Sequence, residues 1–299
     1  MPLSRAGPGL LVRDLLTADD PQILAAIAEI DAIRPDILVL TDFDFDHNLI
    51  ALASFNTQFE RPFEALYASQ PNTGWPTGLD IDQNGRLGDA RDAQGYGTFP
   101  GDGGMAVLSR FPIGTVTDLS HLIWAEQAWS EPPDNMVGGS MQRLSTTAHW
   151  IVPIETPNLT LNLLAWSATP PVFDGPEDRN GRRNADELRL WTHVLHGDYG
   201  PPPTAPVLIG NANLDPNAGE GLRGAMAAVL ADTRLTDPQP RSDQHGSATA
   251  EWPDGPGSMR VSYILPGSEI AVADSGVHWP AQWHAGLGPH RMVWVDISP

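Results

Sequence analysis

The sequence predicts an α/β fold, because helix and strand patterns alternate along the chain. Asp20 followed by Pro21 is typical of a helix start, since aspartate caps the first turn and proline suits the first helical position. The helix is expected to end near Ile33, because Arg-Pro-Asp at residues 34–36 breaks it. The apolar residues 37–40 then predict a buried strand. A helix followed by a buried strand is the layer pattern of an α/β domain.

The same alternation continues towards the C-terminus. Leu161, Leu163 and Leu164 predict an interior strand, because they form an apolar run that is followed by two prolines. A helix at residues 184–195 and a strand at residues 206–209 follow. The remaining expectations are a loop leading to an amphipathic turn at residues 1–18, and strands at residues 103–110, 143–154 and 292–297.

Length and composition allow one large α/β domain or two small ones. The chain has 299 residues, and a hydrophobic content of 41% supports a real core. No run of about eighteen apolar residues is present, so no membrane span is expected. No signal peptide is recognisable in the sequence as given, although a start further upstream would allow export. Cysteine is absent, which excludes disulfides and thiolate chemistry and leaves the compartment open.

The charge balance is strongly acidic. The formal net charge is −20, and all 17 basic residues are arginine. Binding to a duplex is largely the neutralisation of phosphates by basic side chains, and the sequence has no stripe of arginines interleaved with aromatic residues. Nucleic acid is therefore disfavoured as a partner. A small phosphate ester, a cation or an uncharged ligand suits this balance better.

Three aspartates follow the predicted strand at residues 37–40. If the alternation of the strand continues, Asp42, Asp44 and Asp46 lie on one side of it. Three carboxylates on one face repel one another unless a cation or an arginine compensates. The segment is therefore either a ligand for a hard metal ion at a strand tip or a strand end that frays into solvent.

A second acidic segment, at residues 80–92, resembles a calcium loop. Four residues match positions one, three, five and six of such a loop: Asp80, Asp82, Asn84 and Gly85. The carbonyl of Arg86 would add a ligand. Arg91 stands where the loop usually has a glutamate, and Asp89 or Asp92 would substitute for it. The alternative is an acidic turn rich in Asn and Gly, which needs no ion.

Residues 169–187 carry an unusual density of polar and charged side chains directly after the strand that contains Leu161. Loops carried on a rigid strand end often hold functional residues. A solvated, salt-bridged surface loop is the alternative. Composition alone does not decide between the two.

Several segments together resemble one family: TPPVFDGPEDRNGRRN at residues 169–184, GMAVLSR at 104–110, GNAN at 210–213, RVSYILP at 260–266 and GPHR at 288–291. Over residues 9–297 the chain resembles the endonuclease/exonuclease/phosphatase family, whose fold is that of DNase I-like nucleases. The resemblance implies a single domain over residues 1–299, built as a four-layer α/β sandwich of two mixed sheets with outer helices. It also implies a first strand with a metal-binding asparagine, which would lie upstream of this sequence.

The resemblance further implies a magnesium-dependent phosphoester hydrolase and gives roles to individual residues. Asp42 takes the place of the family's magnesium-binding glutamate, Asn213 matches the asparagine that holds the phosphate, and His290 matches the general acid or base. Substrate-binding groups are expected at three more positions: Arg182, Arg183 and His149. For His149 a hydrogen-bonded core residue is the alternative.

Five positions depart from the pattern of the family, and Asp42, in place of a glutamate, is the first of them. Ser167 stands in place of a catalytic histidine, and Asn211, Ser262 and Pro289 each stand in place of an aspartate. Asn211 would occupy the place of the group that acts on the attacking water, yet an amide cannot accept a proton as a carboxylate does. Losing several members of a catalytic unit leaves little activity. Two functions follow: a phosphoester hydrolase that is weakly active or inactive, and a non-catalytic protein that binds a ligand through the same cleft.

Overall fold

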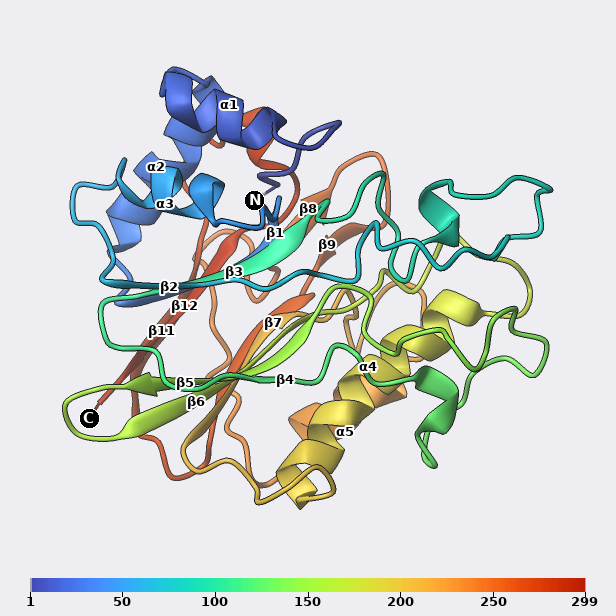
Figure 1. Ribbon diagram of the computed structural model, residues 1–299. Helices are drawn as coiled ribbons and strands as arrows, with labels where there is room; N and C mark the ends of the chain where they lie inside the picture. Colours follow the sequence, from blue (N-terminus) through green and yellow to red (C-terminus); the bar gives the residue numbers. More distant parts are fainter. Residues whose placement is uncertain (1, 299) are drawn as a thin grey trace.

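The computed structural model describes residues 2–298 as stacked layers of sheet and helix (Figure 1). The larger sheet is built from five strands: β4 (Thr117–Asp118), β5 (His149–Glu155), β6 (Thr160–Ser167), β7 (Pro206–Asn211) and β10 (Ser262–Pro266). Their order is β10-β7-β6-β5-β4. Strands β6 and β7 are parallel and the other neighbours are antiparallel, so this sheet is mixed.

The second sheet layer consists of two separate ladders. One joins β1 (Ile37–Phe43), β3 (Gly104–Ser109) and β2 (Ala65–Tyr67) in the order β1-β3-β2, and the other joins β11 (Val272–His278) to β12 (Met292–Ile297). Every pair in both ladders is antiparallel. A short hairpin of β8 (Ala250–Trp252) and β9 (Gly257–Met259) completes the strands. The predicted α/β sandwich is confirmed, with a second layer made of two antiparallel ladders.

An apolar core lies between the two sheet layers. Met105 and Val107 of β3 pack with Trp150 and Val152 of β5 and with Leu163 of β6, and all five are buried. Alternate residues of a strand point to opposite faces. The intervening residues of β6 therefore face the helices on the far side of the larger sheet.

Helices pack on the outer face of the larger sheet and on the β1-β3-β2 ladder (Figure 1). Helices α4 (Arg179–His196) and α5 (Gly224–Leu230) lie on the larger sheet, where Leu164 and Trp166 of β6 meet Leu188 and Trp191 of α4. Helices α1 (Leu10–Thr17), α2 (Pro21–Ile33) and α3 (Ile50–Asn56) share a second core with β1 and β3. Three short 3₁₀ turns are also present: η1 (Ala90–Asp92), η2 (Trp124–Glu126) and η3 (Ala285–Leu287). None of the helices in the described part of the chain combines the length and hydrophobicity needed to cross a membrane.

The N-terminal region shows where local sequence signals succeed and where they fail. The predicted cap of α2 is confirmed, because Asp20 accepts hydrogen bonds from the N–H groups of Gln22 and Ile23 at 2.9 and 3.0 Å. Helix α1 was not predicted. It forms because Leu11 and Leu15, about one turn apart, are buried against the core. The upstream strand implied by the resemblance lies outside the described residues.

Candidate functional site

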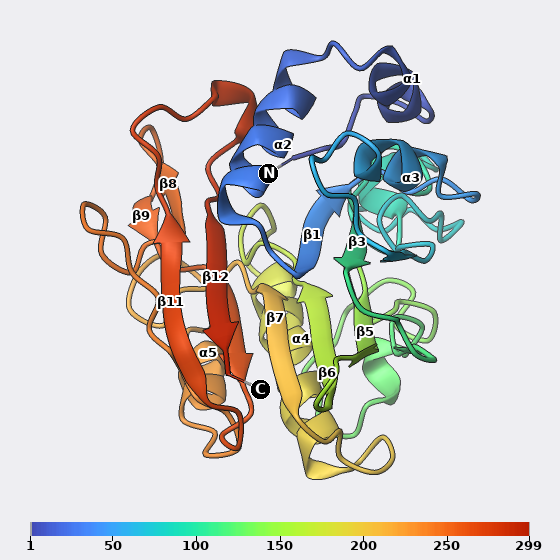
Figure 2. The same ribbon diagram turned by 90° about the vertical axis from the view of Figure 1, so that its left-hand side faces the viewer.

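A row of polar residues crosses three neighbouring strands at one edge of the larger sheet. Ser167, the last residue of β6, is the register partner of Asn211, the last residue of β7. Asn211 also pairs with Ser262, the first residue of β10. Thr41 of β1 and His290, which precedes β12, line the same cavity as Asn211 and Ser262. The ends of β1, β6 and β7 thus lie on the same side of the molecule as the start of β12 (Figure 2).

Asn213 ties the loops after β6 and β7 together. Its φ of 50° is left-handed, a conformation that asparagine tolerates better than most residues. Its Nδ2 donates to the carbonyl of Ala168 at 2.8 Å. Its backbone N–H donates to Asn211 Oδ1 at 3.2 Å, and its Oδ1 accepts from Asn211 Nδ2 at 3.0 Å. The two amides therefore order this edge, and they bring no charge to it.

His290 is held in a partly buried position beside the β8–β9 hairpin. It forms an antiparallel bridge with Ala250, and its ring lies edge-on to Trp252 with the centroids 5.4 Å apart. Burial lowers the pKa of His290 to about 3, and the positive charge of Arg291 acts in the same direction. Its imidazole is therefore neutral near pH 7. Pro289 precedes it, so this position supplies no carboxylate that would raise the pKa.

The three aspartates after the predicted strand do not form one cluster: Asp42 and Asp44 both lie beside Gly103 and their charges interact, whereas Asp46 is engaged at the start of α3. Strand β1 ends before Asp44, so the alternation stops there. Asp44 accepts from the N–H groups of Gly103 at 3.0 Å and Arg5 at 2.8 Å, and burial raises its pKa to about 6. Asp46 caps α3 by accepting from two backbone N–H groups at 2.8 Å. Of the three, Asp42 alone keeps a place at the tip of β1.

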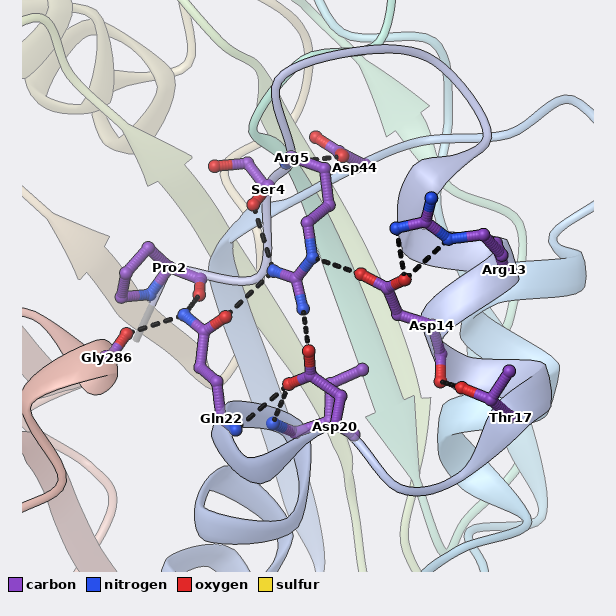
Figure 3. A network of polar contacts seen from close by, with 11 residues as sticks. Pro2, Ser4, Arg5, Arg13, Asp14, Thr17, Asp20, Gln22, Asp44 and Gly286 are labelled. Atoms are coloured by element: carbon purple, nitrogen blue, oxygen red, sulfur yellow. Dashed lines mark hydrogen bonds and ion pairs between the residues drawn. The ribbon is translucent and has the colours of Figure 1, made fainter.

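The segment before α1 is anchored beside this strand tip (Figure 3). Arg5 donates to Asp14 Oδ2 at 2.7 Å and to Gln22 Oε1 at 2.8 Å. Gln22 in turn donates to the carbonyls of Pro2 and Gly286 at 2.6 and 2.5 Å. These contacts fix the first residues of the chain against α2 and the loop before β12.

Asp42 is crowded at the strand tip. Burial raises its pKa, and the negative charge of Asp102 adds to the effect, whereas a hydrogen bond from the Ser4 hydroxyl opposes it. Gly103 packs closely against the carboxyl group, because a Cβ at that position would lie 2.9 Å from Asp42 Oδ1. Gly103 also has a φ of 56°, so glycine is required there on two counts. The surroundings of Asp42 make its ionisation costly.

The donor set at this edge does not fit a magnesium ion held by protein carboxylates. Magnesium prefers hard oxygen ligands in near-octahedral geometry and is usually bound through carboxylates together with substrate phosphates. The carboxyl groups of Asp42, Asp44 and Asp102 lie close enough for their charges to interact, but burial raises the pKa of both Asp42 and Asp44. The neighbouring strand ends carry hydroxyl and amide groups: Ser167, Asn211 and Ser262. Between residues 2 and 298, three acidic side chains with ligand atoms within 4.8 Å of one another occur elsewhere: Asp80, Asp82 and Asp92.

This acidic cluster lies in the loop that resembles a calcium site, and of the two aspartates expected to replace the missing glutamate it contains Asp92. Asp92 is buried and accepts from the N–H groups of Ile81 and Gly88 at 2.7 and 2.8 Å. Asp89 instead accepts from the side-chain Nδ2 of Asn84 at 2.7 Å and caps η1. Asn84 also accepts from the N–H of Arg86 through its Oδ1. The structure therefore groups the carboxylate of Asp92, and not that of Asp89, with those of Asp80 and Asp82. Asn84 lies beside them, because its Nδ2 donates to both Asp82 and Asp89.

Arg183 is not placed to clamp a phosphate, which corrects the prediction for this residue. It lies buried on α4, which begins at Arg179, before the predicted helix start at residue 184. Its guanidinium donates to four backbone carbonyls at 2.7–3.0 Å: those of Leu144, Gln94, Arg143 and Ser145. Arg182, the preceding residue of the helix, is exposed. The charged stretch is thus largely the first turns of a helix whose buried face is polar.

His149 is likewise a core residue, as the alternative interpretation had it. Its Nδ1 lies 2.6 Å from Ser145 Oγ, and its Nε2 lies 3.0 Å from the carbonyl oxygen of Glu187. Burial lowers the pKa of His149 to about 4, so the ring is neutral near pH 7. A side chain with no exposure and both nitrogens engaged cannot bind a substrate.

Two buried residues of α4 that position the site were missed from the sequence. Glu187 accepts from the N–H groups of Thr146 and Thr169 at 2.5 and 2.7 Å, and burial raises its pKa to about 7. Asn184 donates from Nδ2 to the carbonyls of Thr169 and Ala212, both at 2.7 Å. These bonds hold the segments that follow β6 and β7. The helical spacing of Arg183 and Glu187 was the signal that could have revealed them.

Known proteins show the same fold. An endonuclease/exonuclease/phosphatase from Beutenbergia cavernae DSM 12333 superimposes with a TM-score of 0.60 at 16% identity, covering 93% of this chain and 66% of that chain. The chain therefore spans just under two thirds of that relative's length. A family protein from Leptotrichia buccalis C-1013-b gives a TM-score of 0.58 at 15% identity, covering 93% of this chain and 92% of the other. The 3′ phosphatase NExo from Neisseria, bound to a product DNA hairpin, gives 0.52 at 16% identity, covering 92% and 94%.

The sequence itself carries the family assignment. None of the curated proteins matches the chain. The model of the Endonuclease/Exonuclease/phosphatase family, whose members generally depend on a divalent metal, matches residues 12–294, from within α1 to within β12. That match includes both sheet layers and the strand ends where the polar row lies, and the structural matches agree with it in fold. The chain therefore belongs to the Endonuclease/Exonuclease/phosphatase family.

Proposed function

We propose that this protein binds a small phosphate ester at the strand ends without hydrolysing it at an appreciable rate. The observation that carries the proposal is the neutral row of Ser167, Asn211 and Ser262, which offers two hydroxyls and one amide. Membership of the family supports a phosphoester as the class of ligand, and the Neisseria neighbour is itself named a 3′ phosphatase. The net charge of −20 favours a small ligand over a nucleic acid.

The chemistry of this row explains why turnover should be low. Hydrolysis of a phosphoester requires a group that takes a proton from the attacking water and charge that stabilises the transition state. Asn211 can form hydrogen bonds but cannot take the proton. His290 is neutral, but a pKa of about 3 makes it a weak proton acceptor near pH 7. Ser167 is also neutral and cannot stabilise the charge that develops on the phosphate.

Weak hydrolysis assisted by a divalent cation is the second candidate. Asp42 is the observation that favours it, because this carboxyl group and Asp102 lie close enough for their charges to interact. A cation would relieve that repulsion.

Bis-p-nitrophenyl phosphate separates the two candidates. Its hydrolysis is measured with magnesium, with manganese and with EDTA, and its binding is measured by isothermal titration calorimetry. We expect saturable binding and no metal-dependent rate above that of the His290→Ala variant. A magnesium-dependent rate that His290→Ala abolishes would establish the hydrolase instead.

A restoration experiment tests the same point from the opposite direction. The combined variant carries Ser167→His, Asn211→Asp, Ser262→Asp and Pro289→Asp. We expect its turnover to exceed that of the unsubstituted chain by roughly 100-fold or more, because missing members of a catalytic unit typically cost at least that much. A folded quadruple variant with no gain in rate would show that the four substitutions are not what limits activity.

We further propose that the acidic loop binds calcium through Asp80, Asp82 and Asp92. The donor set is all oxygen and carries three carboxylates, which suits calcium. We expect millimolar calcium to raise the melting temperature and EDTA to reverse the rise, with the effect absent in Asp80→Asn. Equal melting curves with calcium and with EDTA would rule the ion out.

A further inference from the structure

The loop between β7 and α5 lies against the segments that adjoin the polar row. Asp215 accepts from the N–H of Arg260 at 2.7 Å, which ties the loop to the chain just before β10. Gly221 packs on Pro171 of the loop after β6, so closely that a Cβ at this position would lie 2.7 Å from the Pro171 Cβ. Its φ of 98° also favours glycine. The loop is therefore fixed beside the ends of all three strands that carry the row.

Phe173 lies in the loop after β6, six residues beyond Ser167. Its side chain is 84% exposed, and its φ of 71° is left-handed, which is unfavourable for an aromatic residue. Asn180 holds the backbone on both sides, because its N–H donates to the carboxylate of Asp174 and its Nδ2 donates to the carbonyl of Val172 at 2.7 Å. The fold thus fixes a strained backbone and leaves the ring in solvent. Backbone strain of this kind is concentrated at positions that contact ligands.

Leu222 and Arg223 add an apolar and a positively charged side chain to the same side of the row. Both follow Gly221 directly, Leu222 is 38% exposed, and Arg223 is exposed as well. The Arg223 guanidinium donates to the backbone carbonyl of Asn217 at 3.1 Å, and no carboxylate of residues 2–298 forms an ion pair with it. In a chain with a net charge of −20, an arginine without an acidic partner is available to an anion.

These three residues, which we call the rim, have the properties that the row lacks. The row offers hydrogen bonds, but neither charge nor a large apolar side chain. Arg223 supplies a positive charge for phosphate oxygens, and Phe173 and Leu222 supply apolar surface. A sugar or polyol attached to the phosphate would place hydroxyls against that surface, and polar groups that lose water without gaining a partner are costly.

We propose that the rim selects a phosphate ester of an apolar alcohol as the ligand of the row. The inference rests on the proposed function, because the row is what holds the phosphate. Arg223 binds the phosphate oxygens from the side of the β7–α5 loop, and the alcohol part lies against Phe173 and Leu222. Contact with the ligand removes the exposed ring of Phe173 from water, which favours binding in proportion to the apolar area covered.

Isothermal titration calorimetry with a matched pair of ligands tests the proposal. Cyclohexyl phosphate and myo-inositol 1-phosphate have the same ring skeleton and the same charge, but the second carries hydroxyls on its ring. Inorganic phosphate measures the contribution of the row and of Arg223 without an alcohol part. We expect cyclohexyl phosphate to bind more tightly than inositol phosphate by roughly tenfold or more, because covering an apolar side chain contributes that much.

Phe173→Asn removes the ring and keeps the left-handed backbone, which asparagine tolerates. We expect this variant to bind cyclohexyl phosphate roughly tenfold more weakly and to bind the other two ligands unchanged. Leu222→Ser tests the same contact from the other loop and should also act on cyclohexyl phosphate alone. Leu16→Ala, at an exposed position of α1, is the matched control and should leave all three affinities unchanged.

Arg223→Gln should weaken all three ligands to a similar extent, by roughly tenfold, because each of them carries the phosphate that this guanidinium contacts. Arg61→Gln, at another exposed arginine, is its control and should weaken none of them. Melting temperatures of all variants verify that each is folded under the conditions of the titration.

The outcomes separate the inference from the function on which it rests. Equal affinities for cyclohexyl phosphate and inositol phosphate would overturn the inference alone, because the site would then bind phosphate whatever alcohol it carries. The inference also fails if both Phe173→Asn and Leu222→Ser weaken all three ligands equally, since the two side chains would then support the loops without contacting the alcohol. No binding of inorganic phosphate or of either ester would overturn the proposed function, and the inference with it.

Discussion

Helix α4 and the strand-end row both carry polar side chains that contact the segments after β6 and β7, but they use them differently. On α4, Arg183 and Glu187 are charged residues buried in the core, and each is fully engaged with backbone groups. In the row, Ser167, Asn211 and Ser262 are neutral, and Asn211 and Ser262 line an open cavity. The densely charged stretch of the sequence therefore holds the loops in place, whereas the three positions of the row carry no charge.

This difference separates the residues that stabilise the fold, on α4, from those that would contact a ligand, in the row. A buried charge is retained only where partners compensate its desolvation, so substitutions on α4 should act on folding. Substitutions in the row should change ligand binding and should have little effect on the free energy of unfolding. The following experiments test that division, from the largest expected effect to the smallest.

Replacing Arg183 with methionine should destabilise the protein the most. The variant leaves four buried carbonyls without their donor and removes the positive charge near Glu187. We expect a loss of about 3–5 kcal/mol in the free energy of unfolding, measured by urea denaturation. The matched control is Arg182→Met, on the neighbouring exposed position, which should change stability by about 0.5 kcal/mol or less. Similar losses for both variants would mean that the buried network does not hold the loops.

Two asparagines allow a direct comparison between the regions. Asn184→Ala removes the donors to the carbonyls of Thr169 and Ala212 in a fully buried position, and should cost about 2 kcal/mol or more. Asn213→Ala removes the link to Ala168 in a half-buried position and should cost about 1 kcal/mol. Urea denaturation with unchanged m-values measures both. A larger loss at Asn213 than at Asn184 would reverse the division between scaffold and site.

The dependence of stability on pH gives the smallest net effect, because two buried groups oppose each other. The folded pKa of Glu187, about 7, lies above its ordinary value of 4.5, so the folded state holds a proton that the unfolded state has lost. Stability from this group therefore falls as the pH rises from about 4.5 to 7. The folded pKa of His149, about 4, lies below its ordinary 6.5, so stability from that group rises between pH 4 and 6.5.

Replacing Glu187 with glutamine removes the contribution to stability that falls with rising pH. The contribution of His149, which rises with pH, then remains. We expect the melting temperature of this variant to climb more steeply between pH 4.5 and 6.5 than that of the unsubstituted protein. The variant also starts lower, because an amide cannot accept from both Thr146 and Thr169, but that offset does not change the slope. Glu177→Gln, at an exposed position before α4, is the control and should leave the slope unchanged. Identical slopes in all three proteins would contradict the burial of an ionisable Glu187.

Local signals in the sequence account for much of the fold. The cap at Asp20, the break after Ile33 and the apolar strands follow from contacts within a few residues, and all appear in the structure. The motif segments were sufficient to indicate the family, and the row of strand ends follows from the order of those segments in the predicted fold. Helix α1 could not be predicted from the sequence, because the burial of its two leucines depends on a core that only the folded chain provides.

What only the tertiary structure decided were the partners of polar groups that lie far apart in the sequence. The sequence suggests a free cation at Arg183. In the folded chain, backbone acceptors near residues 94 and 144 surround its guanidinium group. In the acidic loop, the turn placed Asp92 and not Asp89 beside Asp80, a choice set by backbone geometry that spacing alone does not encode. Periodicity and capping depend on neighbouring residues, so the sequence alone is enough to predict them. The fate of a buried charge depends on which distant carbonyls and amides the folded chain brings to it, and the chain has to be folded before that can be known.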